Sequence, residues 1–294
     1  MNNLKRARGY YLYSQNGDRY LDIGLGCGQF VLGRKQGKSQ LCFKDTLEKG
    51  LTSYSDSVWL NRCKKAIVEF INFGLANSEK KQTFSDYEFL PVLSQSIFLL
   101  NSFLKESLAK EVFLQNDAES LCSFPFALPV WRPWLGFSNF DNSLPSINES
   151  GENKVFPQVF VVINPLPFKE SPVLLAVNKK VMSTNSLLTV ESFLKSTNMF
   201  PSSPFLAGTT RAIYDFISIY SSYDEKQMSR FDSVVLKYWN RKGPWLFPKM
   251  QKSEYEEFKN LCQIKKILIS EKFEQPSFIP QQIDGGELRA LRNL

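Results

Sequence analysis

The sequence predicts an α/β protein, and three observations indicate this class. Segments with the period of amphipathic helices alternate along the chain with short runs of Val, Ile and Phe that suit buried strands. A hydrophobic share of 43% and an aromatic share of 14% over 294 residues suffice for a sizeable core. Turn-forming Gly, Asn and Pro separate the segments, and we find no internal repeat.

Two strands joined by a tight turn are expected near the start of the chain. Aromatic and β-branched residues fill 9–13 and 19–23, and Asn16-Gly17 between them tolerates the positive φ that a hairpin turn needs. A glycine-rich turn follows the second strand directly and is formed by Gly24, Gly26 and Gly28.

Helices and an irregular segment are expected next. Amphipathic periodicity predicts helices over 59–74 and about 93–113, and we interpret 74–79 as a helix C-cap and turn. Four prolines and two tryptophans between 124 and 150 disfavour a helix and predict an irregular segment with packed aromatic side chains.

The second half of the chain continues the alternation of strands and helices. Continuous apolar residues predict buried strands over 156–163 and 171–177, because a sheet covered on both faces needs no polar alternation. A helix is expected over 205–220. The tail should then contain a helix over 253–262 with Ser253 as N-cap and Glu256 as its capping-box partner, a short strand over 267–269, and a last helix that opens near Asp284.

Charge and cysteine content limit the classes of function. The chain carries 36 basic and 29 acidic residues, and its net charge of +7 is spread without a cluster, so we expect a solvated basic surface and no nucleic-acid partner. Five cysteines without CxxC spacing, and no apolar leader after Met1, predict a cytoplasmic protein without disulfides. Because no apolar run reaches the roughly 18 residues of a spanning helix, we expect no membrane segment.

Histidine is absent from the whole sequence. Its absence removes the usual general base, the usual partner of a nucleophilic Ser or Cys, and the usual zinc ligand. Histidine-dependent triads, dyads and metal sites are therefore excluded, and we expect no metal. Any chemistry would depend on carboxylates, lysine or a cofactor.

The glycine-rich turn admits three interpretations. The segment 20–28 resembles the first motif of the S-adenosylmethionine-dependent methyltransferases, whose glycines let the backbone approach the cofactor. That fold also needs a helix directly after the glycines, whereas 32–39 is polar and interrupted by glycine. The glycines could also serve only to turn the strand, or they could belong to the family signature described next.

Several segments in collinear order resemble the class III pyridoxal-phosphate aminotransferases. The segment 7–22, A-R-G-Y-Y-L-Y followed by N-G-D-R-Y-L-D, is similar to the N-terminal signature of that family, and Gly26, Gly28 and Leu32-Gly33 continue it. Later similar segments lie at 50–68, 171–182, 202–216 and 258–291. The resemblance implies a fold-type-I transferase fold, with a mixed or parallel sheet in an abbreviated large domain and an α+β small domain.

The same resemblance implies a small domain built from 1–58 and 222–294 and a large domain over 59–221. In the family, a lysine directly after a strand holds the coenzyme as an imine. Here the strand that ends at Ile163 continues into Asn164-Pro165, neither of which can form an imine, and the nearest amine is Lys169. Arg34 replaces the histidine of the family's L-G-H, and neither the phosphate loop nor the aspartate that binds the pyridine nitrogen is recognisable.

The sequence therefore predicts a degenerate, non-catalytic relative of these aminotransferases with a structural or interaction role and no bound cofactor. Its partner would be a second copy of the chain or another protein. Two alternatives remain open. One is an active pyridoxal-phosphate aminotransferase or aminomutase that uses Lys169, and the other is a methyltransferase that binds its cofactor through Gly24, Gly26 and Gly28.

Overall fold

A computed structural model describes residues 3–34, 37–52, 58–76, 84–93, 130–136, 159–168, 170–179 and 199–293. By their contacts the residues form two units. The first comprises Met1–Gly37, Pro165–Pro167 and Asp215–Leu294, and the second comprises Lys38–Asn164 and Phe168–Tyr214. The domain boundaries at 58/59 and 221/222 stay a prediction. The helix expected over 93–113, and most of the irregular segment over 124–150, lie outside the described residues.

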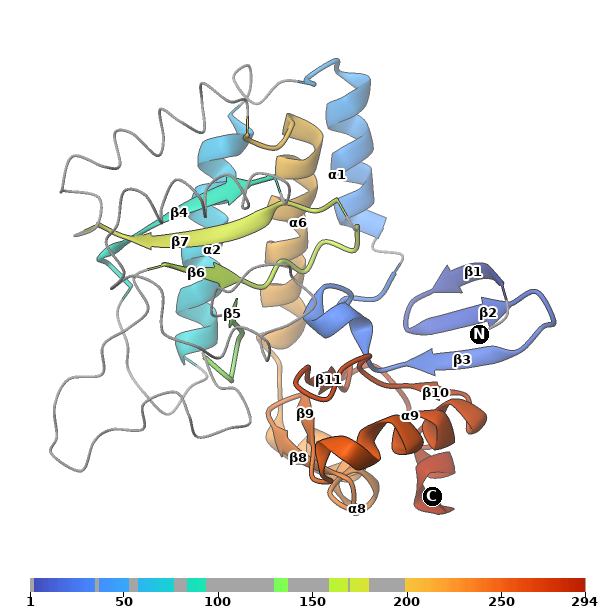
Figure 1. The fold of residues 1–294 in the computed structure, drawn as a ribbon. Helices are drawn as coiled ribbons and strands as arrows, with labels where there is room; N and C mark the ends of the chain where they lie inside the picture. Colours follow the sequence, from blue (N-terminus) through green and yellow to red (C-terminus); the bar gives the residue numbers. More distant parts are fainter. Residues whose placement is uncertain are drawn as a thin grey trace, which may run out of the picture. The chain divides into compact units, whose positions relative to one another are not determined.

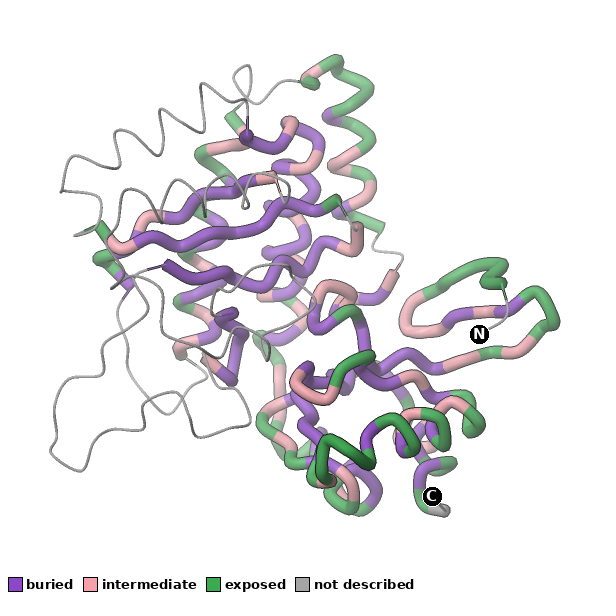
Figure 2. The backbone as a smooth tube through the Cα atoms, in the orientation of Figure 1, coloured by how far each residue is buried: buried purple, intermediate pink, exposed green. Residues whose placement is uncertain are grey.

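The second unit contains a four-stranded mixed sheet with the order β4-β7-β6-β5 (Figure 1). Its strands are β4 (Tyr87–Val92), β5 (Val130–Trp131), β6 (Val159–Val162) and β7 (Val173–Asn178). β7 pairs antiparallel with β4 and β6, whereas β5 runs parallel to β6. Figure 2 shows β6 and β7 buried along nearly their whole length, as the continuous apolar runs predict.

Helices cover one face of this sheet. α2 (Trp59–Ala76) and α6 (Ser203–Tyr220) lie behind the strands in Figure 1 with their axes crossing them, and α2 packs on β4. α1 (Gly37–Glu48) precedes them and contributes Phe43 to a cluster of aromatic rings. The predicted helices over 59–74 and 205–220 and the predicted strand over 171–177 are confirmed. The predicted strand over 156–163 is confirmed in its described part as β6, and 156–158 lie outside the described residues.

Gly74 lies inside α2, so the interpretation of this residue as a C-cap is wrong. A Cβ added at Gly74 would lie 2.5 Å from Cη2 of Trp131 and 3.2 Å from Cα of Pro133. Glycine is therefore needed where α2 passes closely over the Trp131 ring. The rest of the interpreted turn, 77–79, lies outside the described residues.

The first unit contains two sheets. In the first, β1 (Leu4–Arg8), β2 (Tyr11–Ser14) and β3 (Arg19–Asp22) form an antiparallel meander, and β10 (Ile267–Leu268) runs parallel to β3. The second has the order β11 (Ser277–Phe278), β9 (Trp245–Pro248) and β8 (Trp239–Lys242). Gly17, with φ of +87°, lies in the turn that joins β2 to β3. The predicted hairpin and the predicted strand over 267–269 are confirmed.

Short helices complete the first unit: α7 (Glu225–Met228), α8 (Asp232–Val235) and α9 (Tyr255–Ile264). Together with the meander they enclose a hydrophobic core. Its members include Leu21 and Ile23 from β3 and the residue after it, Trp239 from β8, and Phe258 from α9. Residues from both ends of the sequence therefore share one core in this unit.

Two predictions for the tail are wrong. The capping box before α9 uses Gln251 and Glu254, not Ser253 and Glu256, because the chain enters the helix through a 3-10 turn over Lys252–Glu254. After Asp284, whose carboxylate accepts a hydrogen bond from the Gly286 amide at 2.7 Å, no α-helix opens. The chain instead ends in turns and a 3-10 helix over Arg289–Asn293.

Two kinds of feature are absent from the parts of the chain that the structure describes. None of their helices is both long and apolar enough to cross a membrane. No group of three or more Cys, Asp or Glu side chains in these parts could hold a metal ion.

Candidate functional site

The end of β6 is the position where the family resemblance places the coenzyme lysine. β6 is buried at all four residues and lies between β7 and β5. The amide of Ile163 donates to the Trp131 carbonyl at 3.1 Å, so hydrogen bonding to β5 extends one residue beyond the strand. The next side chain is that of Asn164, and this residue is only 8% exposed.

Asn164 links the end of β6 to two other segments. Its Nδ2 donates to the carbonyl of Pro172, just before β7, at 2.8 Å, and to Oγ1 of Thr209 on α6 at 3.3 Å. Thr209 is fully buried. Because buried polar groups are costly without partners, these two bonds give the Asn164 side chain a structural role.

Replacing Asn164 with Ala should lower the free energy of unfolding by about 1–3 kcal/mol, because the buried carbonyl of Pro172 loses its donor. Urea denaturation at neutral pH measures this change. The control is Asn240→Ala at an exposed position on β8, which should change stability by no more than about 0.5 kcal/mol. Equal effects of the two substitutions would contradict the structural role of Asn164.

Lys169 lies outside the described residues. Of the described residues next to it, Ser171 donates its amide and its hydroxyl to the Phe168 carbonyl at 3.0 and 2.6 Å. The Phe168 ring stacks on Phe43 with centroids 5.6 Å apart and meets the edge of Phe205 at 6.4 Å. The described residues next to position 169, Phe168 and Ser171, are therefore held by a turn and by aromatic packing.

None of the described residues next to β5 in the sequence is acidic, and β5 is the parallel neighbour of β6. The described residues between β4 and β6 are Leu93 and the segment V-W-R-P-W-L-G over 130–136, which contain no Asp or Glu. Arg132 directly follows β5 and is 2% exposed. A cation there has the opposite charge to the aspartate that the family resemblance implies for binding a pyridine nitrogen.

The glycine-rich turn after β3 has a left-handed backbone. Four consecutive φ angles are positive, at +44°, +54°, +59° and +107° for Leu25, Gly26, Cys27 and Gly28. A left-handed conformation costs a non-glycine residue about 1–2 kcal/mol. Two hydrogen bonds help to offset this cost. The Leu25 amide donates to Oδ1 of Asp22 at 3.0 Å, and the Cys27 thiol donates to Oε1 of Gln275 at 2.7 Å.

Packing within the first unit accounts for two of the three glycines. A Cβ on Gly24 would lie 2.6 Å from the carbonyl oxygen of Ile269, and one on Gly26 would lie 2.7 Å from Cε2 of Phe30. Gly28 supplies the last positive φ of the turn. β3 pairs antiparallel with β2 and parallel only with the two-residue strand β10, and a left-handed turn follows it instead of an α-helix. The topology therefore argues against the methyltransferase alternative.

An ion pair that the sequence analysis missed lies beside this turn. Asp22 is 5% exposed, and its carboxylate accepts a hydrogen bond from the Arg34 guanidinium. Cζ of Arg34 lies 4.2 Å from the centroid of the Phe30 ring. Arg34, for which the resemblance implies a histidine, therefore stabilises the turn. A spacing of 12 residues between the two partners gives no local signal in the sequence.

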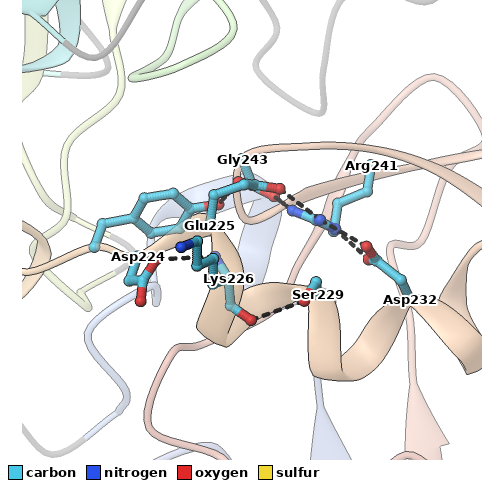
Figure 3. A network of polar contacts seen from close by, with 8 residues as sticks. Asp224, Glu225, Lys226, Ser229, Asp232, Arg241 and Gly243 are labelled. Carbon is cyan, nitrogen blue, oxygen red and sulfur yellow. Dashed lines mark hydrogen bonds and ion pairs between the residues drawn. The ribbon is translucent and has the colours of Figure 1, made fainter.

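A second group of polar contacts that the sequence analysis missed surrounds Arg241 on β8 (Figure 3). The side chain of Arg241 is 7% exposed. Its Nε lies 2.6 Å from Oδ1 of Asp232, and its Nη2 lies 2.6 Å from Oε1 of Glu225. Burial raises the pKa of Glu225, but the hydrogen bonds from Arg241 and Tyr223 outweigh it and hold that pKa below its usual value. Since Nη1 also donates to the Gly243 carbonyl at 3.0 Å, the guanidinium is held by internal partners.

Sequence relatives match only short parts of the chain. An uncharacterized protein of Borreliella burgdorferi is 44% identical over 68 residues, which is 23% of this chain and 25% of that protein. An uncharacterized protein of Treponema pallidum is 44% identical over 48 residues, which is 16% of each. The matches thus span about a quarter or less of these curated relatives. No protein-family model matches the chain.

Solved structures resemble the chain over its whole length. N-acetylornithine aminotransferase from Stenotrophomonas maltophilia matches with a TM-score of 0.60 at 10% identity, covering 100% of this chain and 95% of that one. Ornithine aminotransferase from Plasmodium yoelii gives 0.57 at 12% identity, covering 99% and 91%. The omega transaminase from Pseudomonas jessenii gives 0.60 at 10% identity, covering 100% and 91%. The chain therefore has the α/β fold of the fold-type-I pyridoxal-phosphate transferases.

Proposed function

We propose that this chain is a shortened and divergent relative of the class III aminotransferases that has lost transamination chemistry and serves a structural or interaction role. The observation that carries the proposal is the side chain at the end of β6. Where the resemblance implies an amine, the carboxamide of Asn164 is bonded to Pro172 and Thr209. The described residues do not fit a pyridoxal phosphate held as an imine at this position.

The charge beside that position supports the same proposal. Arg132 follows the neighbouring strand β5 in a buried setting, and no carboxylate lies in the described residues around it in sequence. An arginine has only N–H donors, so it could not accept a hydrogen bond from a protonated pyridine nitrogen as the aspartate implied by the resemblance would. Neither the covalent attachment nor the electronic activation of the coenzyme is supported by the described side chains.

A reduction experiment tests the proposal. Purified protein is incubated with excess pyridoxal phosphate, its absorbance is recorded, and sodium borohydride is added before peptide mass mapping. We expect no aldimine absorbance that borohydride abolishes, and only scattered surface adducts that Lys169→Ala leaves unchanged. A stoichiometric adduct on one lysine would overturn the proposal, and an adduct on Lys169 would establish the active-enzyme alternative.

The partner we propose is a second copy of the chain in the cytoplasm, as the family resemblance implies. Light scattering coupled to size exclusion measures the mass of the particle, which for a dimer is twice the 33.8 kDa of the chain. A particle mass of one chain at every concentration would contradict the proposed dimer and favour a different protein as the partner.

A further inference from the structure

One face of the β1-β2-β3 meander carries alternating arginine and tyrosine side chains. Strand register places Arg6 and Arg19 on either side of Tyr13, and it places Arg8 beside Tyr11. Directly paired residues point to the same face of a sheet. Ring contacts agree, because Cζ of Arg6 lies 4.2 Å from the Tyr13 centroid and Cζ of Arg19 lies 4.7 Å from the Tyr11 centroid. We call these five residues the meander face.

The outer part of the meander face is open to solvent. β1 is exposed at all five of its residues and is coloured as exposed throughout in Figure 2. It is an edge strand, since it pairs with β2 on one side only. Neither Arg6 nor Arg8 forms an ion pair with a carboxylate of the described residues.

At the β3 end the meander face leads into a pocket of about 350 Å³. Tyr11 and Arg19 line this pocket together with Lys265 and Lys266, and Leu21 contributes apolar surface. All of these residues belong to the first unit. The volume lies within the range of pockets that hold a small organic ligand.

Positive charge exceeds negative charge along this surface. Lys266 pairs with Asp18 at 2.6 Å, whereas Arg19 reaches Glu287 only at 3.6 Å. Lys265 forms no ion pair with a described residue. Cations on an edge strand commonly prevent the addition of another strand, but that explanation covers β1 only and leaves the cations of the pocket unexplained.

We propose that the meander face and its pocket bind single-stranded nucleic acid. Arginine side chains would contact the phosphates, and the Tyr11 and guanidinium planes would stack against bases without regard to sequence. The path from β1 to β10 crosses three strand spacings, or about 14 Å. A ligand lying across the strands would contact the arginines of β1, those of β3 and the pocket. An acidic peptide added to the β1 edge would contact β1 alone.

The sequence alone predicts no nucleic-acid partner, because its positive charge forms no cluster along the chain. The cations lie at both ends of the chain, at 6, 8 and 19 and at 265 and 266, so they form no run in the sequence. The parallel pairing of β10 with β3 brings them to one surface. The inference does not depend on whether coenzyme chemistry is retained, because no residue of β6 takes part.

Fluorescence anisotropy with a labelled oligothymidylate tests the proposal. The oligothymidylate has about 12 nucleotides, a length that one small binding domain can cover. We expect saturable binding that weakens as salt rises. The double variant Arg6→Glu with Arg8→Glu should bind at least about tenfold more weakly. The matched control, Lys242→Glu with Lys272→Glu, changes the same charge at exposed positions outside the meander face and should lose less than about threefold. Tyr11→Leu should weaken binding without changing the salt dependence.

Circular dichroism confirms that each variant is folded before binding is compared. Equal losses in the two double variants would attribute binding to net charge alone and overturn the proposal. So would competition by polyglutamate as effective as by unlabelled oligothymidylate, because the surface would then select acidic polypeptides equally well. A duplex bound as tightly as the single strand, or no saturable binding, would also overturn it.

Discussion

Replacing Trp131 with Ala should lower the free energy of unfolding by about 3–5 kcal/mol, because it removes the largest side chain at the centre of a buried contact. Trp131 is 1% exposed on β5, and its ring meets the edge of Phe70 with centroids 6.0 Å apart. Urea denaturation followed by circular dichroism measures the loss. Trp59→Ala makes the same deletion at the half-buried start of α2 and should cost less than half as much.

The contact with Gly74 gives a sharper version of the same test. Gly74→Ala alone should destabilise by about 1–3 kcal/mol, because its Cβ would lie 2.5 Å from the Trp131 ring. In the Trp131→Ala background the added methyl group has room, and its cost should fall. A double-mutant cycle measures this coupling, and strictly additive effects would contradict the close approach of α2 to Trp131.

These two residues show where prediction from the sequence ends. The apolar periods of α2 and β6 are local signals, and both elements were predictable from them. Contact between Gly74 and Trp131 depends on two distant segments meeting, so a glycine near the end of a helical pattern was interpreted as a cap. Only the three-dimensional structure shows that Gly74 is needed for the close packing of α2 on Trp131.

The candidate site also has features that the sequence predicts and features that it does not. That an asparagine follows β6 is read directly from the sequence, and the strand itself was predictable from its continuous apolar run. The left-handed turn was not predictable in detail, since Leu25 and Cys27 adopt a φ that side chains disfavour. The pattern S-x-x-E at Ser253 fits a capping box, yet Gln251 takes that role although glutamine is not a preferred N-cap.

Replacing Arg241 with Met should lower the free energy of unfolding at neutral pH by about 2–4 kcal/mol. Breaking a fully buried ion pair costs roughly 3–5 kcal/mol, and the partial exposure of Asp232 and Glu225 reduces that cost. The substitution leaves the carboxylates of Asp232 and Glu225 without the cation that both of them contact. Urea denaturation measures the change, and Lys259→Met, which breaks a more exposed pair with Glu256, should cost about 0.5 kcal/mol or less.

Acidification separates the ion-pair contribution of Arg241 from its packing. Arg241 holds the folded-state pKa of Glu225 below its usual value of 4.5, despite the opposing effect of burial. The stabilisation is therefore present above that usual value and is lost as pH falls through the lower folded-state pKa. The difference between wild type and Arg241→Met should shrink between pH 7 and about pH 3. A difference that stays constant over this range would assign the loss to the packed stem of the arginine instead of its charge.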